Sequence, residues 1–223
     1  STSIVYGSTR DHTLAVKALL SDGSSVCFSS LSNQEFNSKL KEDSLEGALY
    51  RHLHSELSDP LIRNQIELGY PKASISRRNT GYAVDALMNT SPFEASVECF
   101  NLSTLICGSE GTLAFITELK LQIVPLPKPF QVVLNAHFNS INESLQATLV
   151  AMKMSPTACE LMDKTILDCT KDNLLQQKNR FFVEGDPEAI LMIEFKGDTI
   201  DEAKEQAKEL KLSLVQLKLG YAY

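Results

Sequence analysis

The chain has 223 residues, 43% hydrophobic and 22% charged, and its 28 acidic and 21 basic residues give a formal net charge of −7. This composition is typical of a globular protein with a hydrophobic core, and the length suffices for one large domain or two smaller ones. The acidic balance argues against a nucleic-acid or anionic-membrane partner, because both require a concentrated basic face. No run of 18 or more apolar residues is present, so no integral membrane segment is predicted.

The cysteines and histidines form no recognisable metal-binding pattern. The five cysteines are scattered, and no two of them have C-x-x-C spacing. His52 and His54 are two residues apart on a predicted helix and therefore do not share a face. We predict no metal site, and reduced thiols in a cytosolic protein.

The first half of the chain predicts a β-hairpin, then helices, then a loop and a second sheet segment. Leucines recur at helical spacing from about Asn33 to Leu68, and Pro60 divides this stretch into two helices. The expected elements are strands at 12–20 and 25–28, helices at 33–59 and 61–68, an ordered loop at 72–96, a short helix at 102–107 and a long strand at 113–124.

A proline-rich stretch at 125–129 predicts a domain boundary, because three prolines in five residues cannot continue a ladder of strands. We therefore expect one domain at 1–126 and another at 127–223. Strands and helices alternate beyond the prolines, which favours an α+β layer with helices on one face of a sheet. The expected strands are 130–138, 159–162 and 189–195, and the expected helices are 141–152, 165–176 and 199–210.

A glycine-rich turn at Gly108–Thr112 is the strongest candidate for a ligand contact. It lies between a predicted helix and a predicted strand, and glycine lets a ligand approach the backbone N–H groups because no Cβ intervenes. Thr112 adds a hydroxyl donor. Glu110 would repel a phosphate, so its carboxylate is expected to accept from backbone N–H groups of the turn or from a ribose hydroxyl. Taken alone, G-S-E-G-T also fits a tight turn without a ligand, and it is neither a Rossmann nor a P-loop motif.

Three stretches occur in a characteristic order: Y-G-S-T-R-D-H at 6–12, R-N-T-G-Y-A-V-D at 78–85, and G-S-E-G-T-L-A-F-I-T-E at 108–118. Together they resemble the FAD-linked oxidases of the vanillyl-alcohol oxidase superfamily, in particular the branch of D-lactate, glycolate and 2-hydroxyglutarate dehydrogenases. Ala114 stands where many members have glycine, which is a small departure. The resemblance covers residues 1–127 well and the rest more loosely, and it suggests an internal fragment of a large bacterial member.

The resemblance implies an α+β fold in two parts. Residues 1–126 would form the second lobe of a two-lobed FAD-binding domain, a mainly antiparallel sheet with a helical insertion. Residues 127–223 would form the N-terminal part of an α+β, ferredoxin-like substrate cap. The implied cofactor is FAD, and the residues expected to contact it are Tyr6, Gly7, Gly108, Ser109, Glu110, Gly111, Thr112 and Leu113.

The implied reaction is the oxidation of a small 2-hydroxy acid, of the D-lactate or glycolate type, by hydride transfer to the flavin. The electron acceptor stays unknown. Arg78, Asn79 and Tyr82 are candidates for the substrate entrance, with Arg78 available for a carboxylate; the alternative is a structural turn in which Tyr82 only packs. The family's acid/base histidine, metal ligands and P-x-G-G-G loop are not found here, so no residue is assigned a catalytic role and the fragment alone is expected to be inactive.

Two other classes stay open. One is a non-catalytic α/β interaction module, in which G-S-E-G-T binds nothing; the flavin absorbance of the full-length protein separates this class. The other is a different reaction in the same superfamily, such as cell-wall precursor reduction or aryl alcohol oxidation, which a substrate panel separates. We expect a cytoplasmic location, and a peripheral association of the full-length protein with the inner membrane stays open.

Overall fold

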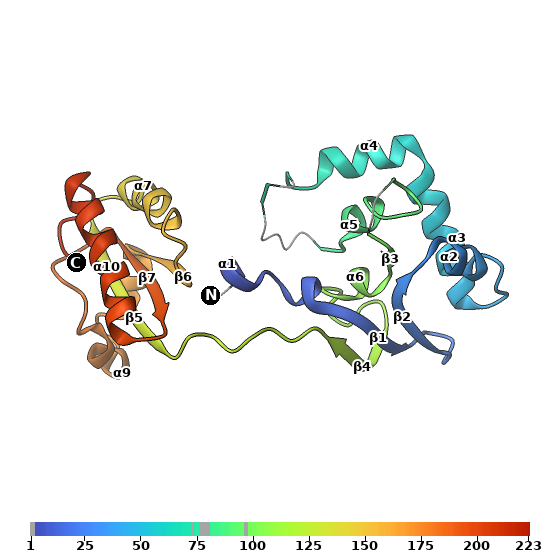
Figure 1. The fold of residues 1–223 in the computed structure, drawn as a ribbon, viewed down its shortest axis with the longest axis horizontal. Helices are drawn as coiled ribbons and strands as arrows, with labels where there is room; N and C mark the ends of the chain where they lie inside the picture. The colour runs from blue at the N-terminus through green and yellow to red at the C-terminus, as the bar shows by residue number, and fades with distance from the viewer. Residues whose placement is uncertain (1–2, 73, 76–80, 96–97) are drawn as a thin grey trace. The chain divides into compact units, whose positions relative to one another are not determined.

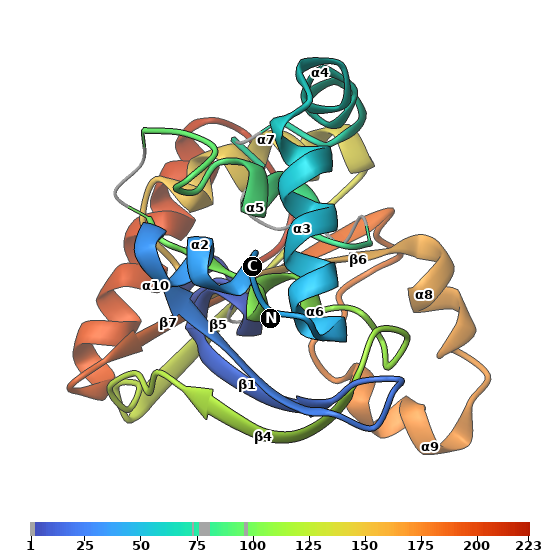
Figure 2. The same ribbon diagram turned by 90° about the vertical axis from the view of Figure 1, so that its right-hand side faces the viewer.

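The chain divides into two compact units, Gly7–Val124 and Pro125–Tyr223, and the second unit also includes Ser1–Tyr6. The computed structural model describes residues 3–72, 74–75, 81–95 and 98–223. Figures 1 and 2 show the helices and strands of both units from two sides. The division falls between Val124 and Pro125, where the proline-rich stretch begins. Among the described residues, none of the helices has both the length and the apolar character that a membrane crossing needs.

The unit Gly7–Val124 is built on a four-stranded antiparallel sheet in the order β3-β2-β1-β4. The predicted hairpin is confirmed, with β1 (Thr13–Leu19) paired to β2 (Ser25–Leu31). The short β3 (Phe100–Asn101) extends the sheet beyond β2, and β4 (Phe115–Leu121) pairs with β1. The last strand is shorter than the predicted 113–124, because residues 113 and 114 still belong to the connection that follows the glycine-rich turn.

Helices of this unit pack on one face of the sheet. Figure 2 shows α2, α3 and α6 on the same side of β1, and their buried side chains share one hydrophobic core with those of β1 and β2. The loop at 72–96 contains one short helix among its described residues. The helical segments of this unit are η1 (Thr9–His12), α2 (Asn33–Lys39), α3 (Leu45–Ser58), α4 (Pro60–Gly69), α5 (Val84–Met88) and α6 (Ser103–Ile106).

The expectation of two helices between residues 33 and 68 is wrong, because the chain leaves the helix after α2 and starts again at α3. Ser44 caps the new helix, since its hydroxyl accepts from the N–H of Gly47 at 3.0 Å. Arg51 of α3 donates to the carbonyl oxygens of Leu40 and Glu42 in the intervening turn, at 3.0 and 2.7 Å. These contacts stabilise a break that helical periodicity alone does not reveal. Pro60 begins α4, as predicted.

Aromatic rings dominate the core of this unit. Phe36 is fully buried, and its ring centroid lies 4.9 Å from that of Phe100, 5.7 Å from that of Tyr50 and 5.9 Å from that of Phe93. The pairs are edge-on, which is a favourable geometry for aromatic rings. Val16 and Phe28 of the sheet belong to the same core. This cluster joins α2, α3 and the loop before β3 to the sheet.

The other unit is a three-stranded sheet with two helices packed on one face. β5 (Phe130–Phe138) and β6 (Ala158–Asp163) each pair antiparallel with β7 (Ala189–Gly197), which lies between them. α7 (Ile141–Met152) connects β5 to β6, so the arrangement is a split β-α-β unit of the ferredoxin-like kind. α10 (Ile200–Gln216) packs beside α7 on the sheet. The predicted α+β class and the alternating order are confirmed.

The single helix expected at 165–176 is wrong. The chain forms α8 (Lys164–Cys169) and then α9 (Leu174–Gln177), because the Asn173 side chain accepts from the N–H of Leu175 at 3.0 Å and starts a new helical turn. The remaining helical pieces of this unit are α1 (Ser3–Tyr6) and η2 (Lys178–Arg180).

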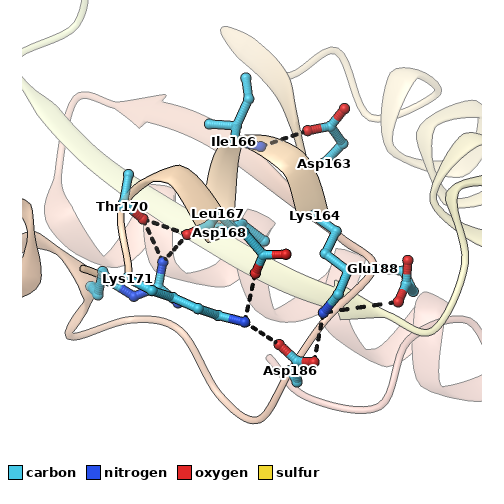
Figure 3. Close-up of polar contacts among 10 residues, drawn as sticks. Asp163, Lys164, Ile166, Leu167, Asp168, Thr170, Lys171, Asp186 and Glu188 are labelled. Atoms are coloured by element: carbon cyan, nitrogen blue, oxygen red, sulfur yellow. Dashed lines mark hydrogen bonds and ion pairs between the residues drawn. The ribbon is translucent and has the colours of Figure 1, made fainter. Parts of the chain in front are cut away.

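An ion-pair network fastens α8 to the loop that precedes β7 (Figure 3). Asp186 accepts from Lys164 at 2.6 Å and from Lys171 at 2.8 Å. Lys171 also contacts Asp168 at 2.5 Å, and Lys164 lies 4.0 Å from Glu188. The hydrogen bonds from Lys164 and Lys171 lower the pKa of Asp186 from its ordinary value of 3.8 to about 2.

This pKa predicts an acid-sensitive contribution to stability. Because the folded-state pKa of Asp186 is depressed, its contribution is present above about pH 4 and is lost as the pH falls through 2. Asp186→Asn should therefore flatten the dependence of stability on pH in this window, measured by urea unfolding from pH 5 to pH 2. Asp172→Asn, at an exposed position, is the control and should keep the wild-type slope. Parallel curves for wild type and Asp186→Asn would contradict the prediction.

Candidate functional site

The glycine-rich turn connects α6 to β4 and has an unusual backbone conformation. Gly108, Glu110 and Gly111 have positive φ angles of 91°, 52° and 77°. The N–H of Ser109 donates to a carbonyl of α6 at 3.1 Å, and the N–H of Thr112 donates to the carbonyl of Ser109 at 3.0 Å. Within the described part of the chain, the N–H groups of Gly108, Glu110 and Gly111 donate to no protein oxygen. The turn therefore presents free backbone donors, which is the property of anion-binding turns.

The two glycines of this turn are required for different reasons. A Cβ built on Gly111 would meet no atom within 4 Å, so the space beside it is open to a ligand. A Cβ built on Gly108 would lie 2.9 Å from Nη2 of Arg10. Gly108 thus combines a left-handed backbone with close contact to a guanidinium group, whereas Gly111 combines the same backbone with open space.

Arg10 holds the turn against the segment that leads into β1. Its Nε donates to the carbonyl oxygen of Thr104 at 3.2 Å, and its Nη2 donates to that of Cys107 at 2.9 Å. These carbonyl groups belong to the C-terminal end of α6, where the last carbonyl oxygens have no N–H donor within the helix. No sequence pattern singled out Arg10 as a site residue, although it lies within the Y-G-S-T-R-D-H stretch at 6–12 that carries the family resemblance.

The structure also brings Tyr82 to this turn. The Tyr82 hydroxyl lies 2.6 Å from Oγ1 of Thr112, and Thr112 in turn donates to the carbonyl of Ser109 at 2.6 Å. Tyr70 donates to the Tyr82 carbonyl at 2.6 Å and so fixes its backbone. Tyr82, the last residue of the R-N-T-G-Y motif, therefore contacts the glycine-rich turn. The Thr112 hydroxyl, expected as a donor to a ligand, is already used within the protein.

The contact between Tyr82 and Thr112 predicts coupled effects on stability. Tyr82→Phe should lower the free energy of unfolding by about 0.5–1.5 kcal/mol, the usual contribution of one hydrogen bond. Thr112→Ala should lower it further, because it also removes the hydrogen bond to the Ser109 carbonyl. Because both remove the same bond, the double variant should lose less than the sum, as measured by urea unfolding. Tyr221→Phe, which removes a hydroxyl contact in the other unit, is the control and should be additive with Thr112→Ala. Additivity of the Tyr82 and Thr112 variants would show that they do not interact.

Tyr6 and Gly7, both expected to contact the cofactor, lie in different units. Tyr6 ends α1 and belongs with Pro125–Tyr223, whereas Gly7 belongs to the unit that contains the turn. Gly7 has a φ of 70°, and a Cβ there would lie 2.6 Å from Oδ2 of Asp11. Asp11 accepts from the N–H and hydroxyl of Ser8 at 2.7 and 2.9 Å, so the local capping of η1 explains this glycine.

The remaining predicted residues have varied positions. Ser109 is buried inside the turn. Leu113 follows the turn and is partly exposed. The Glu110 side chain is exposed and, in the segments that the structure describes, forms no hydrogen bond with the turn. Arg78 and Asn79 lie outside the described residues. No group of three or more potential metal-ligating side chains occurs among the described residues.

Comparison with known proteins defines the class of protein. Residues 127–219 match the family described as FAD linked oxidases, C-terminal domain. This match, together with the relatives described below, confirms the resemblance to FAD-linked oxidases that the three sequence motifs indicated. FAD is the cofactor that this family binds.

D-2-hydroxyglutarate dehydrogenases are similar to this chain over most of its length. The enzyme of Pantoea ananatis is 27% identical over 212 residues, which cover 93% of this chain and 20% of that protein. The enzyme of Escherichia coli is 29% identical over 205 residues, covering 90% of this chain and 19% of that protein. The D-lactate dehydrogenase of Anaerostipes hadrus is 33% identical over 120 residues, covering 51% of this chain and 25% of that protein. The chain thus spans about a fifth of the length of the D-2-hydroxyglutarate dehydrogenases that it matches.

Proposed function

We propose that this chain is part of a flavoprotein that oxidises a 2-hydroxy acid, and that the turn at Gly108–Thr112 contacts its FAD. One observation carries the proposal: three N–H groups of this turn have no acceptor among the described residues, and the space beside Gly111 is open. A dinucleotide has phosphate and ribose oxygens that accept from such donors. When bound, FAD would supply the hydride acceptor for the oxidation.

In this proposal the two parts of the chain have different roles. Residues 1–126, which contain the turn, would form the second lobe of the FAD-binding domain. Residues 127–223 would form the N-terminal part of the substrate cap. Tyr82 lies next to the glycine-rich turn, which supports a role for Tyr82 close to the flavin and the substrate. Arg78 and Asn79, from the same motif, are kept as candidates for the substrate entrance.

The substrate that we favour is D-2-hydroxyglutarate. Relatives with that name align over 90–93% of this chain, whereas the D-lactate dehydrogenase of Anaerostipes hadrus and the glycolate oxidase subunit GlcD of Bacillus subtilis align over 51–52%. D-lactate and glycolate, the substrate types expected from the sequence motifs, are the second candidates. All three are 2-hydroxy acids, and D-2-hydroxyglutarate carries a second carboxylate.

The test is anaerobic reduction of the purified full-length protein by a panel of hydroxy acids. D-2-hydroxyglutarate should bleach the flavin absorbance fastest, D-lactate and glycolate more slowly, and L-2-hydroxyglutarate not at all. Faster bleaching by D-lactate or glycolate would reverse the order of the substrates. A full-length protein that purifies without flavin and does not take it up would favour an interaction module instead.

A further inference from the structure

We propose that Arg10 is a positioning residue of the glycine-rich turn at Gly108–Thr112. We also propose that its charge favours a phosphate group of the dinucleotide at the free N–H groups of this turn. This inference rests on the proposed function. It adds a residue that lies about a hundred positions before the turn in the sequence and that none of the motifs identified by itself.

The first step is geometric. α6 is only four residues long, so it has little hydrogen bonding of its own to fix the direction in which it ends. Arg10 donates from two different nitrogens to the carbonyl oxygens of Thr104 and Cys107, and this fork holds the end of α6 in one orientation. The turn begins at the next residue, Gly108. The direction of its N–H groups therefore depends on the Arg10 fork.

The second step is the mutual fit of Arg10 and Gly108. Nη2 of Arg10 would lie 2.9 Å from a Cβ at Gly108, a distance shorter than ordinary contacts allow. A side chain at position 108 would therefore displace the guanidinium group from its present position. It would also have to adopt the unfavourable φ of 91°.

The third step is electrostatic. Both acceptors of Arg10 are neutral carbonyl groups, and within the described residues no carboxylate lies at ion-pair distance from its guanidinium. An arginine side chain keeps its charge, so an uncompensated positive charge lies against the start of the turn. This local positive charge contrasts with the net charge of −7 of the whole chain. An anionic group at the free N–H donors would be attracted by it.

The experiment compares Arg10→Met and Arg10→Lys in the full-length protein. FAD affinity, measured in the folded fraction by flavin fluorescence, should fall about tenfold or more in Arg10→Met, as expected for loss of a charge-assisted contact. Arg10→Lys should be intermediate, because it keeps the charge but not the fork. The dependence of FAD affinity on salt concentration should become weaker in Arg10→Met and stay near wild type in Arg10→Lys.

Arg51→Met is the matched control. Arg51 also donates to two backbone carbonyl groups in the same unit, those of Leu40 and Glu42, but it does not touch the turn. It should leave FAD affinity and its salt dependence unchanged. If Arg10→Met lowers only the thermal midpoint, as Arg51→Met can, and leaves FAD affinity unchanged, the role of Arg10 is purely structural and the proposal is overturned.

A double variant tests the mutual fit. Gly108→Ala should displace Arg10, so Arg10→Met should weaken FAD binding less in the Gly108→Ala background than in the wild type. If Arg10→Met weakens FAD binding equally in both backgrounds, the positions of Arg10 and Gly108 do not depend on each other.

Failure of this inference is distinguishable from failure of the proposed function. If Gly111→Val keeps full FAD occupancy, the cofactor assignment of the turn is overturned. If Gly111→Val loses FAD but Arg10→Met binds it with wild-type affinity, only the role of Arg10 is overturned.

Discussion

Gly111→Val is expected to abolish stoichiometric FAD binding by the full-length protein while leaving it folded. Gly111 has a φ of 77°, and the space where a side chain would grow is free of protein atoms. A valine there would strain the backbone by about 1–3 kcal/mol, which a folded domain can tolerate. It would also place a branched Cβ where we propose that the dinucleotide approaches. The measurement is the flavin-to-protein ratio of the folded fraction, together with the thermal midpoint.

Gly23→Val is the matched control for this variant. Gly23 lies in the turn between β1 and β2, has a φ of 84°, and also has no protein atom within 4 Å of a built Cβ. The two substitutions therefore impose similar strain and differ in their position relative to the proposed site. Gly23→Val should lose a similar amount of stability and keep its flavin. If Gly111→Val is folded and keeps full flavin occupancy, the turn is structural and does not contact the cofactor.

Phe36→Ala is expected to lower the free energy of unfolding by about 3–5 kcal/mol, the range for removal of a buried aromatic side chain. Phe36 is fully buried, and its ring contacts those of Tyr50, Phe93 and Phe100. Truncation leaves a cavity between α2, α3 and the sheet and removes three edge-on ring contacts. Urea unfolding of the 223-residue chain, followed by circular dichroism, measures the loss.

Phe115→Ala is the control for this prediction. Phe115 starts β4 in the same unit and is 72% exposed, so its removal from the 223-residue chain should change stability by no more than about 0.5 kcal/mol. Similar losses for both variants would mean that the aromatic cluster is not the centre of this core.

Local patterns in the sequence determined much of the secondary structure. The apolar and β-tolerant residues at 12–20 and 25–28, with a turn between them, predicted the hairpin of β1 and β2, and Pro60 predicted the start of α4. Such features depend on neighbours two to four residues away, so the sequence contains them directly. The order of strands and helices after residue 130 was also predictable, and the three motifs were sufficient to indicate the FAD-linked oxidases.

Only the tertiary structure decided which of these parts meet. Arg51 stabilises the break between α2 and α3, β7 lies between β5 and β6, and Tyr82 reaches Thr112. Arg10 reaches α6 across 94–97 positions of sequence. The periodicity of the sequence does not indicate such contacts, because many distant residues offer hydrogen-bonding groups of similar chemistry. The partner is determined only when the helices and strands bury their apolar faces together and bring particular polar groups within hydrogen-bonding distance.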